Sequence, residues 1–481
     1  MDTLRINPND NVAVVIEPIA AGQDTVDFGH KIALTDIAKG EQIIKYGYPI
    51  GSASADIKAG EWVHTHNMKT NLSGQLSYKY TPALTPPAPR EPGVFMGFRR
   101  LGGKVGVRNE IWIIPTVGCV NDIGKVIARK AQNMLCGSVS GIYCFSHPYG
   151  CSQMGEDLSN TQKALCGLIR HPNAGGVLVL GLGCENNNLA AMKEALGDVD
   201  ENRIKFLDCQ DVTDELESAR ALLEGLIANA EHDIREPVST SELIVGLKCG
   251  GSDGFSGITA NPLVGAFSDL LIAEGGSAIL TEVPEMFGSE TILMNRCTDE
   301  RIFNKTVSLI NDFKAYFLNY GQPVYENPSP GNKAGGITTL EDKALGCTQK
   351  AGTAAVNDVL TYGEILKVKG LNLLQSPGND LVAATALAVS GAQLILFTTG
   401  RGTPFGAPVP TVKISTNTKL YNKKSRWIDF DAGPIASGTA LNSLVDQFYD
   451  YVIKLACGKI LTNNEENEIR DIAVFKNGVT L

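Results

Sequence analysis

The chain of 481 residues is too long for one ordinary hydrophobic core, so we expect two or three domains. A hydrophobic content of 43%, a charged content of 20% and the lack of a long apolar run predict a globular protein without a membrane span. The net charge of −10 argues against nucleic acid and against an acidic membrane surface as partners. Eleven cysteines and an N-terminus without a secretory signal predict reduced thiols and a cytoplasmic location.

The N-terminal residues 1–80 predict a small β-rich domain. Short strands are expected at 12–16, 31–37 and 42–46, separated by Gly and Asp turns. His64 and His66 lie two residues apart, and on a strand this spacing places both imidazoles on one face, where they can hold a divalent metal. Two solvated surface histidines explain the same pattern equally well.

Residues 81–96 contain five prolines and predict a semi-rigid linker. Strand and helix patterns alternate after it, which predicts an α/β fold with mainly parallel sheets. We expect a first α/β catalytic domain over 97–237 and a second over 238–481. The predicted helices include 214–232, 300–318 and 441–456.

The segment 243–262, LIVGLKCGGSDGFSGITANP, is the most informative stretch of the chain. An apolar strand runs into a loop with Cys249, Ser252 and Asp253, and Asn261 is expected to cap the helix that follows. Open α/β sheets bind their ligands at such carboxyl ends of strands. A plain glycine-rich turn with a small buried cysteine is the alternative.

Other predicted strands end in similar loops. Glycine-rich, polar and often thiol-bearing segments follow the apolar runs near 111–114, 141–145, 177–180 and 393–397. The repetition of this pattern predicts a shared site at the strand ends.

Cys151, Cys184 and Cys249 are the candidate metal ligands on these loops. Thiolates suit iron or zinc, and three of them leave a coordination position open for substrate. Small buried cysteines that pack strand ends explain the pattern as well. Cys119 and Cys347 are weaker candidates for the same role.

Three further side chains could take part in the chemistry. His147, on a loop that also carries Cys151, is a candidate general base or acid, or else a turn histidine bonded to a carbonyl. Arg401, between two glycines, can present its guanidinium to a carboxylate, and Lys248 can add positive charge. No nucleotide-binding signature is present.

Long segments of the chain resemble the altronate/galactarate dehydratase family, and the N-terminal module resembles its SAF domain. The matching segments are GFRR at 97–100, GVRNE at 106–110, PTVGC at 115–119, GLGCENN at 181–187, KCGGSDGFSGITANP at 248–262, TEVPEMFGSE at 281–290, NPSPGNKAGGITTLEDKALGCTQKAG at 327–352 and TTGRGTPFG at 398–406. The resemblance implies loss of water from a sugar acid, with Fe(II), or Mn(II) as a substitute, as cofactor.

The segments 63–67, 145–153 and 345–352 resemble the members of the family that act on altronate. This implies conversion of D-altronate to 2-dehydro-3-deoxy-D-gluconate and water. Galactarate or sulfolactate dehydration, and sugar-acid binding without catalysis, are the alternatives. The sequence permits a homo-oligomer and does not determine it.

We assign each candidate residue a role in this dehydration. We expect catalysis by His147 as the base, with Lys248 and Asp253. Recognition of the substrate is assigned to Ser252, Asn261, Glu185 and Arg401, with Arg401 on the carboxylate. The metal is expected at Cys151, Cys184 and Cys249 or at the pair His64 and His66, and a three-cysteine iron–sulfur cluster is a further alternative.

Overall fold

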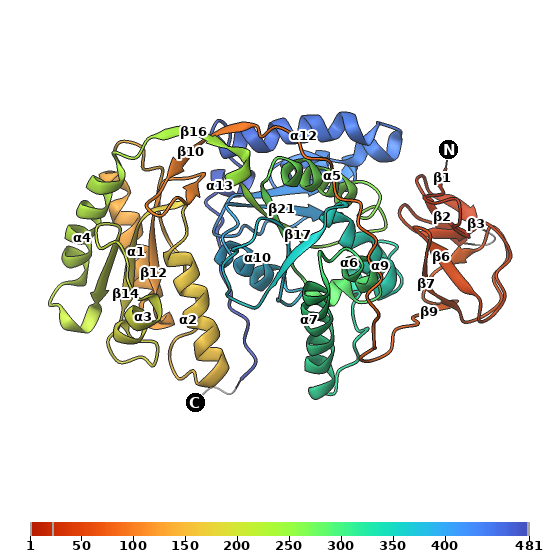
Figure 1. The fold of residues 1–481 in the computed structure, drawn as a ribbon, viewed down its shortest axis with the longest axis horizontal. Helices are drawn as coiled ribbons and strands as arrows, with labels where there is room; N and C mark the ends of the chain where they lie inside the picture. The colour runs from red at the N-terminus through yellow and green to blue at the C-terminus, as the bar shows by residue number, and fades with distance from the viewer. Residues whose placement is uncertain (1, 22–23, 479–481) are drawn as a thin grey trace.

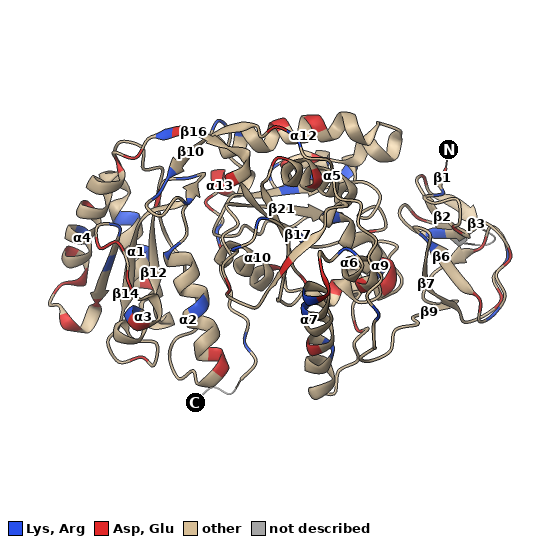
Figure 2. Ribbon diagram, viewed as in Figure 1, with Lys and Arg blue, Asp and Glu red and all other residues tan. Residues whose placement is uncertain are grey.

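The computed structural model describes residues 2–21 and 24–478 and confirms the predicted fold class. A strand-rich N-terminal module and two α/β units lie side by side, with the larger unit in the middle (Figure 1). Within the described residues, no helix is both long and apolar enough to cross a membrane. Lys and Arg are interspersed with Asp and Glu along all three parts (Figure 2), so the acidic excess is spread over the chain.

The N-terminal module consists of short antiparallel strands. One sheet has the order β1-β2-β5-β8, a second has the order β6-β7-β9, and β3 pairs with β4. The strands are β1 (Thr3–Leu4), β2 (Val12–Val15), β3 (Ile19–Ala21), β4 (Asp24–Val26), β5 (Lys31–Ala33), β6 (Gln42–Lys45), β7 (Tyr48–Ala53), β8 (Trp62–Val63) and β9 (Met68–Lys69). The predicted strands at 12–16, 31–37 and 42–46 correspond to β2, β5 and β6.

A buried ion network attaches this module to the large unit. Lys31 Nζ lies 2.8 Å from Asp342 Oδ2, and Lys45 Nζ lies 3.0 Å from Asp342 Oδ1. Lys31 also donates to the carbonyl of Gly336 at 2.7 Å. Burial alone raises the pKa of Asp342, but the two ammonium groups outweigh it and hold that pKa below its ordinary value. The contact therefore depends on charges that are paired away from water.

The segment between the module and the first unit is irregular and lies along the large unit. Residues 70–93 contain no helix or strand. The strand β10 (Val94–Arg99) includes the last three residues of the predicted 81–96 linker. The hydroxyl of Tyr78 donates to Glu290 at 2.6 Å, and that of Tyr80 donates to the carbonyl of Cys297 at 2.6 Å. The segment is thus fixed to the surface of the large unit.

The first α/β unit has a parallel sheet with the order β13-β12-β14-β15. The antiparallel strands β10, β11 (Val105–Gly106) and β16 (Arg235–Ser239) form a small sheet beside it that leads into the large unit. The strands of the parallel sheet are β12 (Glu110–Pro115), β13 (Ile142–Cys144), β14 (Ala174–Gly181) and β15 (Ile204–Asp208), and the helices are α1 (Asn121–Ala131), α2 (Gly155–Ile169), α3 (Leu189–Leu196) and α4 (Glu215–Ala230).

The large unit contains a parallel seven-stranded sheet with the order β19-β20-β18-β17-β21-β22-β23. Its strands are β17 (Ile244–Cys249), β18 (Ser277–Leu280), β19 (Val356–Leu360), β20 (Gly370–Leu374), β21 (Leu394–Thr399), β22 (Thr411–Ser415) and β23 (Phe430–Asp431). Its helices are α5 (Ala260–Ala273), α6 (Glu290–Met294), α7 (Glu300–Asn319), α8 (Pro330–Ala334), α9 (Leu340–Cys347), α10 (Asp380–Val389), α11 (Thr418–Lys423), α12 (Leu441–Ala456) and α13 (Asn463–Glu466).

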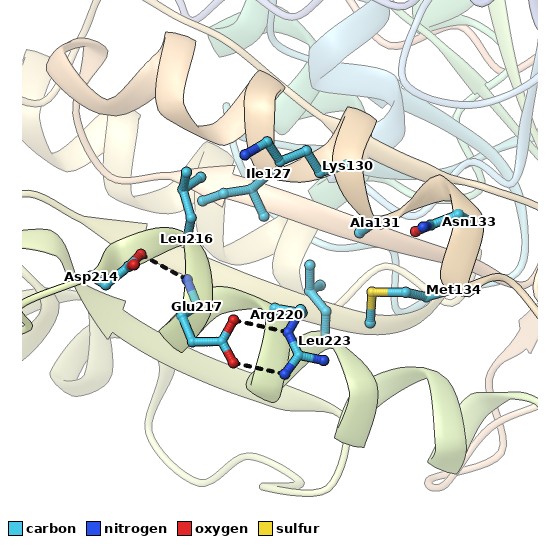
Figure 3. A pocket seen from close by; sticks show the side chains of 10 residues that line it. All are labelled: Ile127, Lys130, Ala131, Asn133, Met134, Asp214, Leu216, Glu217, Arg220 and Leu223. Atoms are coloured by element: carbon cyan, nitrogen blue, oxygen red, sulfur yellow. Dashed lines mark hydrogen bonds and ion pairs between the residues drawn. The ribbon is translucent and has the colours of Figure 1, made fainter.

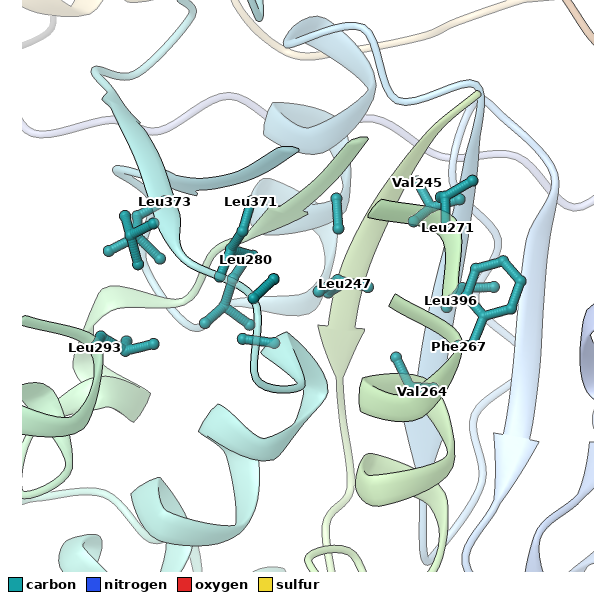
Figure 4. Packing of buried hydrophobic residues seen from close by; sticks show 14 of the residues in the cluster. Val245, Leu247, Val264, Phe267, Leu271, Leu280, Leu293, Leu371, Leu373 and Leu396 are labelled. Atoms are coloured by element: carbon teal, nitrogen blue, oxygen red, sulfur yellow. The ribbon is translucent and has the colours of Figure 1, made fainter. Parts of the chain in front are cut away.

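Apolar packing fixes the central strands of this sheet. Val264, Phe267 and Leu271 of α5 are fully buried and point toward β17 and β21 (Figure 4). Each such side chain contributes about 1.5–3 kcal/mol by leaving water. Strands covered on both faces are apolar along their whole length, so polar side chains concentrate where the strands end.

The predicted helices at 214–232, 300–318 and 441–456 correspond to α4, α7 and α12. The predicted cap of the helix after the Cys249 loop is wrong. Thr259 precedes α5, whereas Asn261 lies in its first turn. The Asn261 side chain instead accepts from Thr398 at 2.6 Å and donates to the carbonyl of Gly346 at 2.9 Å.

Replacing Asp342 by asparagine should loosen the N-terminal module. The substitution leaves Lys31 and Lys45 buried without a carboxylate, which costs about 3–5 kcal/mol of unfolding free energy. Because the pKa of Asp342 is lowered on folding, its contribution is present near neutral pH and is lost as the pH falls below the ordinary aspartate range. Chemical denaturation and limited proteolysis after residue 70 measure the effect. Asp36→Asn, which breaks an exposed ion pair with Lys58, is the control, and an equal loss in both variants would contradict the expectation.

Candidate active site

A cluster of buried ionisable groups lies at the carboxyl end of β17. Cys249, the last residue of the strand, has its Sγ 2.9 Å from Glu285 Oε2 and 3.4 Å from Cys347 Sγ. Lys350 donates to the same sulfur at 3.0 Å. These groups come from β17, from the 3-10 turn after β18, from the end of α9 and from the 3-10 turn that follows α9. The fold therefore collects them from segments up to about a hundred residues apart, Cys249 and Lys350 being separated by 101 residues.

Lys248, the neighbour of Cys249 on β17, is equally buried and is paired with two carboxylates. Its ammonium group contacts Glu282 Oε1 and lies 2.8 Å from Asp380 Oδ1. Glu282 also accepts from the backbone N–H of Cys249 at 3.0 Å. The backbone of Glu282 is left-handed, with φ of 70°, an uncommon conformation for a residue with a side chain. This conformation lets one carboxylate bind both residues at the strand end.

The surroundings of Cys249 favour its thiolate. A hydrogen bond from the Cys347 thiol, together with the charges of Lys350 and Lys248, lowers the pKa of Cys249 to about 6 against the opposing effects of burial and of the Glu285 carboxylate. The pKa of Cys347 is raised, first because its thiol donates to Cys249. At neutral pH the pair therefore consists of one thiolate and one thiol.

The two glutamates of the cluster are shifted in opposite directions. Burial and the neighbouring Cys249 and Glu285 raise the pKa of Glu282. Burial acts on Glu285 as well, but the charges of Lys343, Lys350 and Lys248 outweigh it and lower the pKa of Glu285. Lys343 Nζ lies 2.7 Å from Glu285 Oε1. Adjacent carboxyl groups with opposite pKa shifts are typical of acid–base sites.

Three donors of this cluster are arranged as metal ligands. The ligand atoms of Cys249, Glu285 and Cys347 all lie within 4.8 Å of one another, and all three residues are buried. Two sulfurs and one carboxylate suit a borderline ion such as Fe(II) better than Mn(II), which prefers oxygen ligands. Lys350 and Lys343 already bond to two of these donors, so an ion would have to displace or share those contacts.

The Asp253 carboxylate, predicted to be catalytic, is held by the protein itself. It accepts from Thr416 at 2.8 Å, from Asn417 at 3.3 Å and from the backbone of Phe255 at 3.1 Å. A Cβ on Gly400 would lie 2.2 Å from Asp253 Cγ, so only glycine fits there. Burial raises the pKa of Asp253. These contacts make Asp253 a clamp between the loops after β17, β21 and β22.

Ser252 and Asn261, predicted to bind substrate hydroxyls, are buried beside this clamp. Ser252 is 1% exposed and its carbonyl accepts from Asn332 at 2.8 Å. The Asn261 amide bonds to Thr398 and to Gly346 as described above. Their contacts in this structure are structural, and their role toward a substrate stays a prediction.

Arg401 is an open cation at the same sheet edge. It is exposed, and its Nη1 lies 3.5 Å from the carbonyl of Gly331. It forms no ion pair with any residue that the structure describes. A Cβ on Gly251 would lie 3.5 Å from Arg401 Cβ, and one on Gly250 would lie 2.7 Å from both carboxylate oxygens of Asp380. The two glycines thus bring a free guanidinium and the partly exposed Asp380 to opposite sides of one short loop.

His147 and Glu185 lie on loops of the first α/β unit. Both ring nitrogens of His147 are engaged with backbone: Nε2 lies 2.7 Å from the Pro115 carbonyl, and Nδ1 accepts from the Tyr149 N–H at 3.2 Å. These contacts match the alternative of a turn histidine and leave no free nitrogen for a base. Glu185 accepts from Thr116 at 2.5 Å and from the N–H of Gly183 at 2.8 Å. Its carboxylate therefore holds its own loop against the loop of Thr116.

The three thiols that are predicted to share a metal lie at the ends of strands in two different sheets. Cys249 is buried at the end of β17, whereas Cys151 and Cys184 are exposed on loops after β13 and β14 of the other sheet. In the described part of the chain the only group of metal-ligand spacing is Cys249, Glu285 and Cys347. The predicted set therefore does not form around one ion in this arrangement.

The alternative pair, His64 and His66, does not lie on one strand face. The strand β8 ends at Val63, and a turn closed by Asn67, which accepts from the N–H of His64 at 3.0 Å, follows it. His64 is buried and lies 3.1 Å from Thr338 Oγ1, and His66 is exposed. Both rings pack against Trp62. The two imidazoles thus share contact with Trp62 but differ in exposure.

A cavity of about 440 Å³ lies between α1 and α4 and has fewer reactive side chains than the buried cluster (Figure 3). Leu216, Leu223 and Met134 line it, and the ion pair of Glu217 with Arg220 lies at its rim. Neither a thiol nor a histidine faces it. The buried cluster remains the better candidate site.

The sequence interpretation missed five members of the cluster, namely Glu282, Glu285, Lys343, Lys350 and Asp380. Glu282 and Glu285 directly follow the buried strand β18, and Asp380 begins α10 after β20. The rule that polar groups at strand ends converge applies to them as it does to Cys249.

Comparison with known proteins identifies the class to which this fold and site belong. Residues 240–480 match the family described as D-galactarate/altronate dehydratase, C-terminal, and residues 97–231 match D-galactarate dehydratase/altronate hydrolase, second domain. Residues 1–71 match the altronate/galactarate dehydratase SAF domain, which confirms the predicted SAF-like module. The chain belongs to the altronate/galactarate dehydratase family.

Full-length relatives narrow the comparison within the family. The chain is 56% identical to an altronate dehydratase of Bacillus subtilis (strain 168), with 99% of each chain covered. It is 54% identical to an altronate dehydratase of Escherichia coli (strain K12), with 100% of each chain covered. A galactarate dehydratase (L-threo-forming) of Escherichia coli (strain K12) is 31% identical over 98% of this chain and 96% of that protein. The chain is thus more similar to the two altronate dehydratases.

Cys249 should titrate as a thiolate near neutral pH. The ultraviolet absorption of thiolates should show a step at a pH of about 6 that is missing in Cys249→Ala. Lys350→Met removes a positive donor and should move that step to higher pH. Cys166→Ala is the control, since burial raises the pKa of Cys166 to about 11 and the step should remain. A step that survives in Cys249→Ala would assign the thiolate elsewhere.

Proposed function

We propose that this chain is a hydro-lyase that converts D-altronate to 2-dehydro-3-deoxy-D-gluconate and water. The observation that carries the proposal is the similarity over the whole chain to two proteins named altronate dehydratase, at 56% and 54% identity. The lower identity of 31% to a galactarate dehydratase favours altronate over galactarate as substrate. A sugar acid is also the substrate type that an unpaired arginine at a sheet edge can bind.

The reaction sets clear demands on the site. The proton on C2, next to the substrate carboxylate, is weakly acidic, and the C3 hydroxyl is a poor leaving group. A base must take the C2 proton, an acid must protonate the C3 hydroxyl, and positive charge must stabilise the negative charge that develops on the carboxylate. The resulting enol then becomes the keto acid.

The groups at the open side of the cluster can meet these demands. Arg401 is exposed and free of a carboxylate partner among the described residues, so we assign it to the substrate carboxylate. Asp380 is the solvent-facing member of the ion network, with its side chain 35% exposed. We assign it to proton transfer, with Lys248 behind it at 2.8 Å to balance its charge. The Gly250–Gly251 backbone lies close to both side chains, because a Cβ on Gly250 would approach Asp380 to 2.7 Å and one on Gly251 would approach Arg401 to 3.5 Å.

Iron(II), with manganese(II) as a substitute, is the cofactor that we propose for the reaction. Cys249, Glu285 and Cys347 would hold it, because their donor atoms have ligand spacing. Such an ion supplies Lewis-acid stabilisation of negative charge on the substrate. We further place the protein in the cytoplasm, because its eleven cysteines are all unpaired, which suits a reducing compartment.

Turnover of candidate acids tests the proposal directly. Protein purified without oxygen and supplied with iron(II) is incubated with D-altronate, galactarate or sulfolactate, and the 2-keto acid product is measured. We expect product from altronate at a kcat/KM well above that for galactarate. Binding of altronate without any product would favour a sugar-acid-binding protein, and preference for another acid would replace altronate as substrate.

Arg401 and Asp380 should affect different kinetic constants. Arg401→Gln removes a charge-assisted contact of about 1.5–3 kcal/mol and should raise KM about ten- to a hundred-fold. Asp380→Asn should instead lower kcat by about 10²- to 10⁴-fold with a smaller change in KM. Arg129→Gln and Asp446→Asn, on exposed faces of α1 and α12, are the matched controls. A loss of stability instead of this split, measured by thermal unfolding, would give both residues a structural role only.

A further inference from the structure

Three exposed thiols lie at the carboxyl edge of the sheet in the first α/β unit. Cys119, Cys151 and Cys184 follow β12, β13 and β14, which are adjacent parallel strands. Of the four exposed cysteines in the described residues, only Cys136 lies elsewhere. Cysteine is among the residues most often buried, so three exposed thiols at one edge indicate a binding role.

Backbone hydrogen bonds hold the three loops together. The Gly118 N–H donates to the Tyr149 carbonyl at 2.9 Å, which joins the Cys119 and Cys151 loops. The Asn187 N–H donates to the Gly150 carbonyl at 3.0 Å, which joins the Cys151 and Cys184 loops. A Cβ on Gly150 would lie 2.0 Å from the Thr116 carbonyl oxygen, so only glycine permits this approach. The thiols are therefore carried on one connected set of loops.

The electrostatic setting favours an anionic group at this edge. Each of the three loops runs into the N-terminus of a helix of eight residues or more: α1, α2 or α3. Helix N-termini stabilise thiolates and other anions. The structure shows no lysine or arginine bonded to Cys119, Cys151 or Cys184, in contrast to Cys249, whose sulfur accepts from Lys350.

Unsatisfied polar atoms at the same edge are a second, independent observation. Asn187 is fully buried on the Cys184 loop, and its Oδ1 has no hydrogen-bond partner among the described residues. Asp208 Oδ1, a buried atom at the end of β15, is also without a hydrogen-bond partner among the described residues. Buried polar atoms are normally hydrogen-bonded, so these two acceptors point to a bound group with a donor, such as a water or a hydroxyl, at this edge.

We propose that Cys119, Cys151 and Cys184 bind an iron–sulfur cluster with one iron left open to a non-protein ligand. The three sulfurs do not have the mutual spacing of ligands to one ion, which is found only for Cys249, Glu285 and Cys347 in the described part of the chain. A multi-iron cluster separates its thiolate ligands more widely than a single ion does and takes cysteine sulfur as its usual ligand. This site is distinct from the cluster at Cys249.

The test compares serine variants of the full chain purified without oxygen and reconstituted with ferrous iron and sulfide. The parent protein should contain about four iron and four sulfide per chain and show cluster absorption in the visible range. Cys119→Ser, Cys151→Ser and Cys184→Ser should each lose most of the iron, the sulfide and the absorption. Because all three side chains are exposed, these variants should keep the thermal unfolding of the cluster-free parent.

Two controls separate this site from other thiols. Cys136→Ser changes the remaining exposed cysteine, and Cys249→Ser changes the buried cluster, and both should retain the iron–sulfur absorption. Iron without sulfide, zinc in its place, or absorption unchanged in Cys151→Ser and Cys184→Ser would overturn the proposal. Altronate turnover is measured on the same samples and can fail while the cluster binds, so the two proposals are tested separately.

Discussion

The large unit depends on a set of buried charges that are stable only because they neutralise one another. Glu282 is central, since its carboxylate binds both the ammonium of Lys248 and the backbone N–H of Cys249. Without such partners, ions removed from water would each cost several kcal/mol. The apolar strands of the seven-stranded sheet supply the dry surroundings, and the pairing across β17, β18 and α10 supplies the compensation. The shifted pKa values of Cys249, Glu282 and Glu285 are the direct result.

The helix α9 connects this cluster to the N-terminal module. Asp342, in its first turn, binds Lys31 and Lys45 of the module, and Cys347, its last residue, contacts Cys249. One short helix thus carries the module's buried anchor at one end and a thiol of the candidate site at the other. A movement of the module can therefore shift Cys347. Loss of the ion pairs of Asp342 would change the position of α9 and, with it, of the thiol in the site.

Periodicity and strand-end chemistry predicted the fold well and the site only in part. The helices α4, α7 and α12 follow from apolar spacing, and Cys249 follows from its place after a buried strand. The grouping of the thiols could not be predicted this way, because strands of two different sheets end in similar glycine- and cysteine-bearing loops. Local pattern does not tell which sheet a strand joins. It also does not reveal that the amide of Asn261 bonds to Thr398 instead of capping its own helix.

The two sheet edges place their thiols in different surroundings, and this difference has chemical consequences. At Cys249 the negative charge is already balanced by Lys350 and by the thiol of Cys347, in a site closed to water. At Cys151 and Cys184 the sulfurs are exposed and face no ammonium group in the described structure, and helix N-termini lie behind them. A cation that binds Cys249 must compete with existing hydrogen bonds, whereas a metal cluster at the exposed edge would need no such exchange. A single ion at Cys249, Glu285 and Cys347 would therefore share its donors with protein ammonium groups, whereas a cluster at the exposed edge would bind thiols that have no such partner in the described structure.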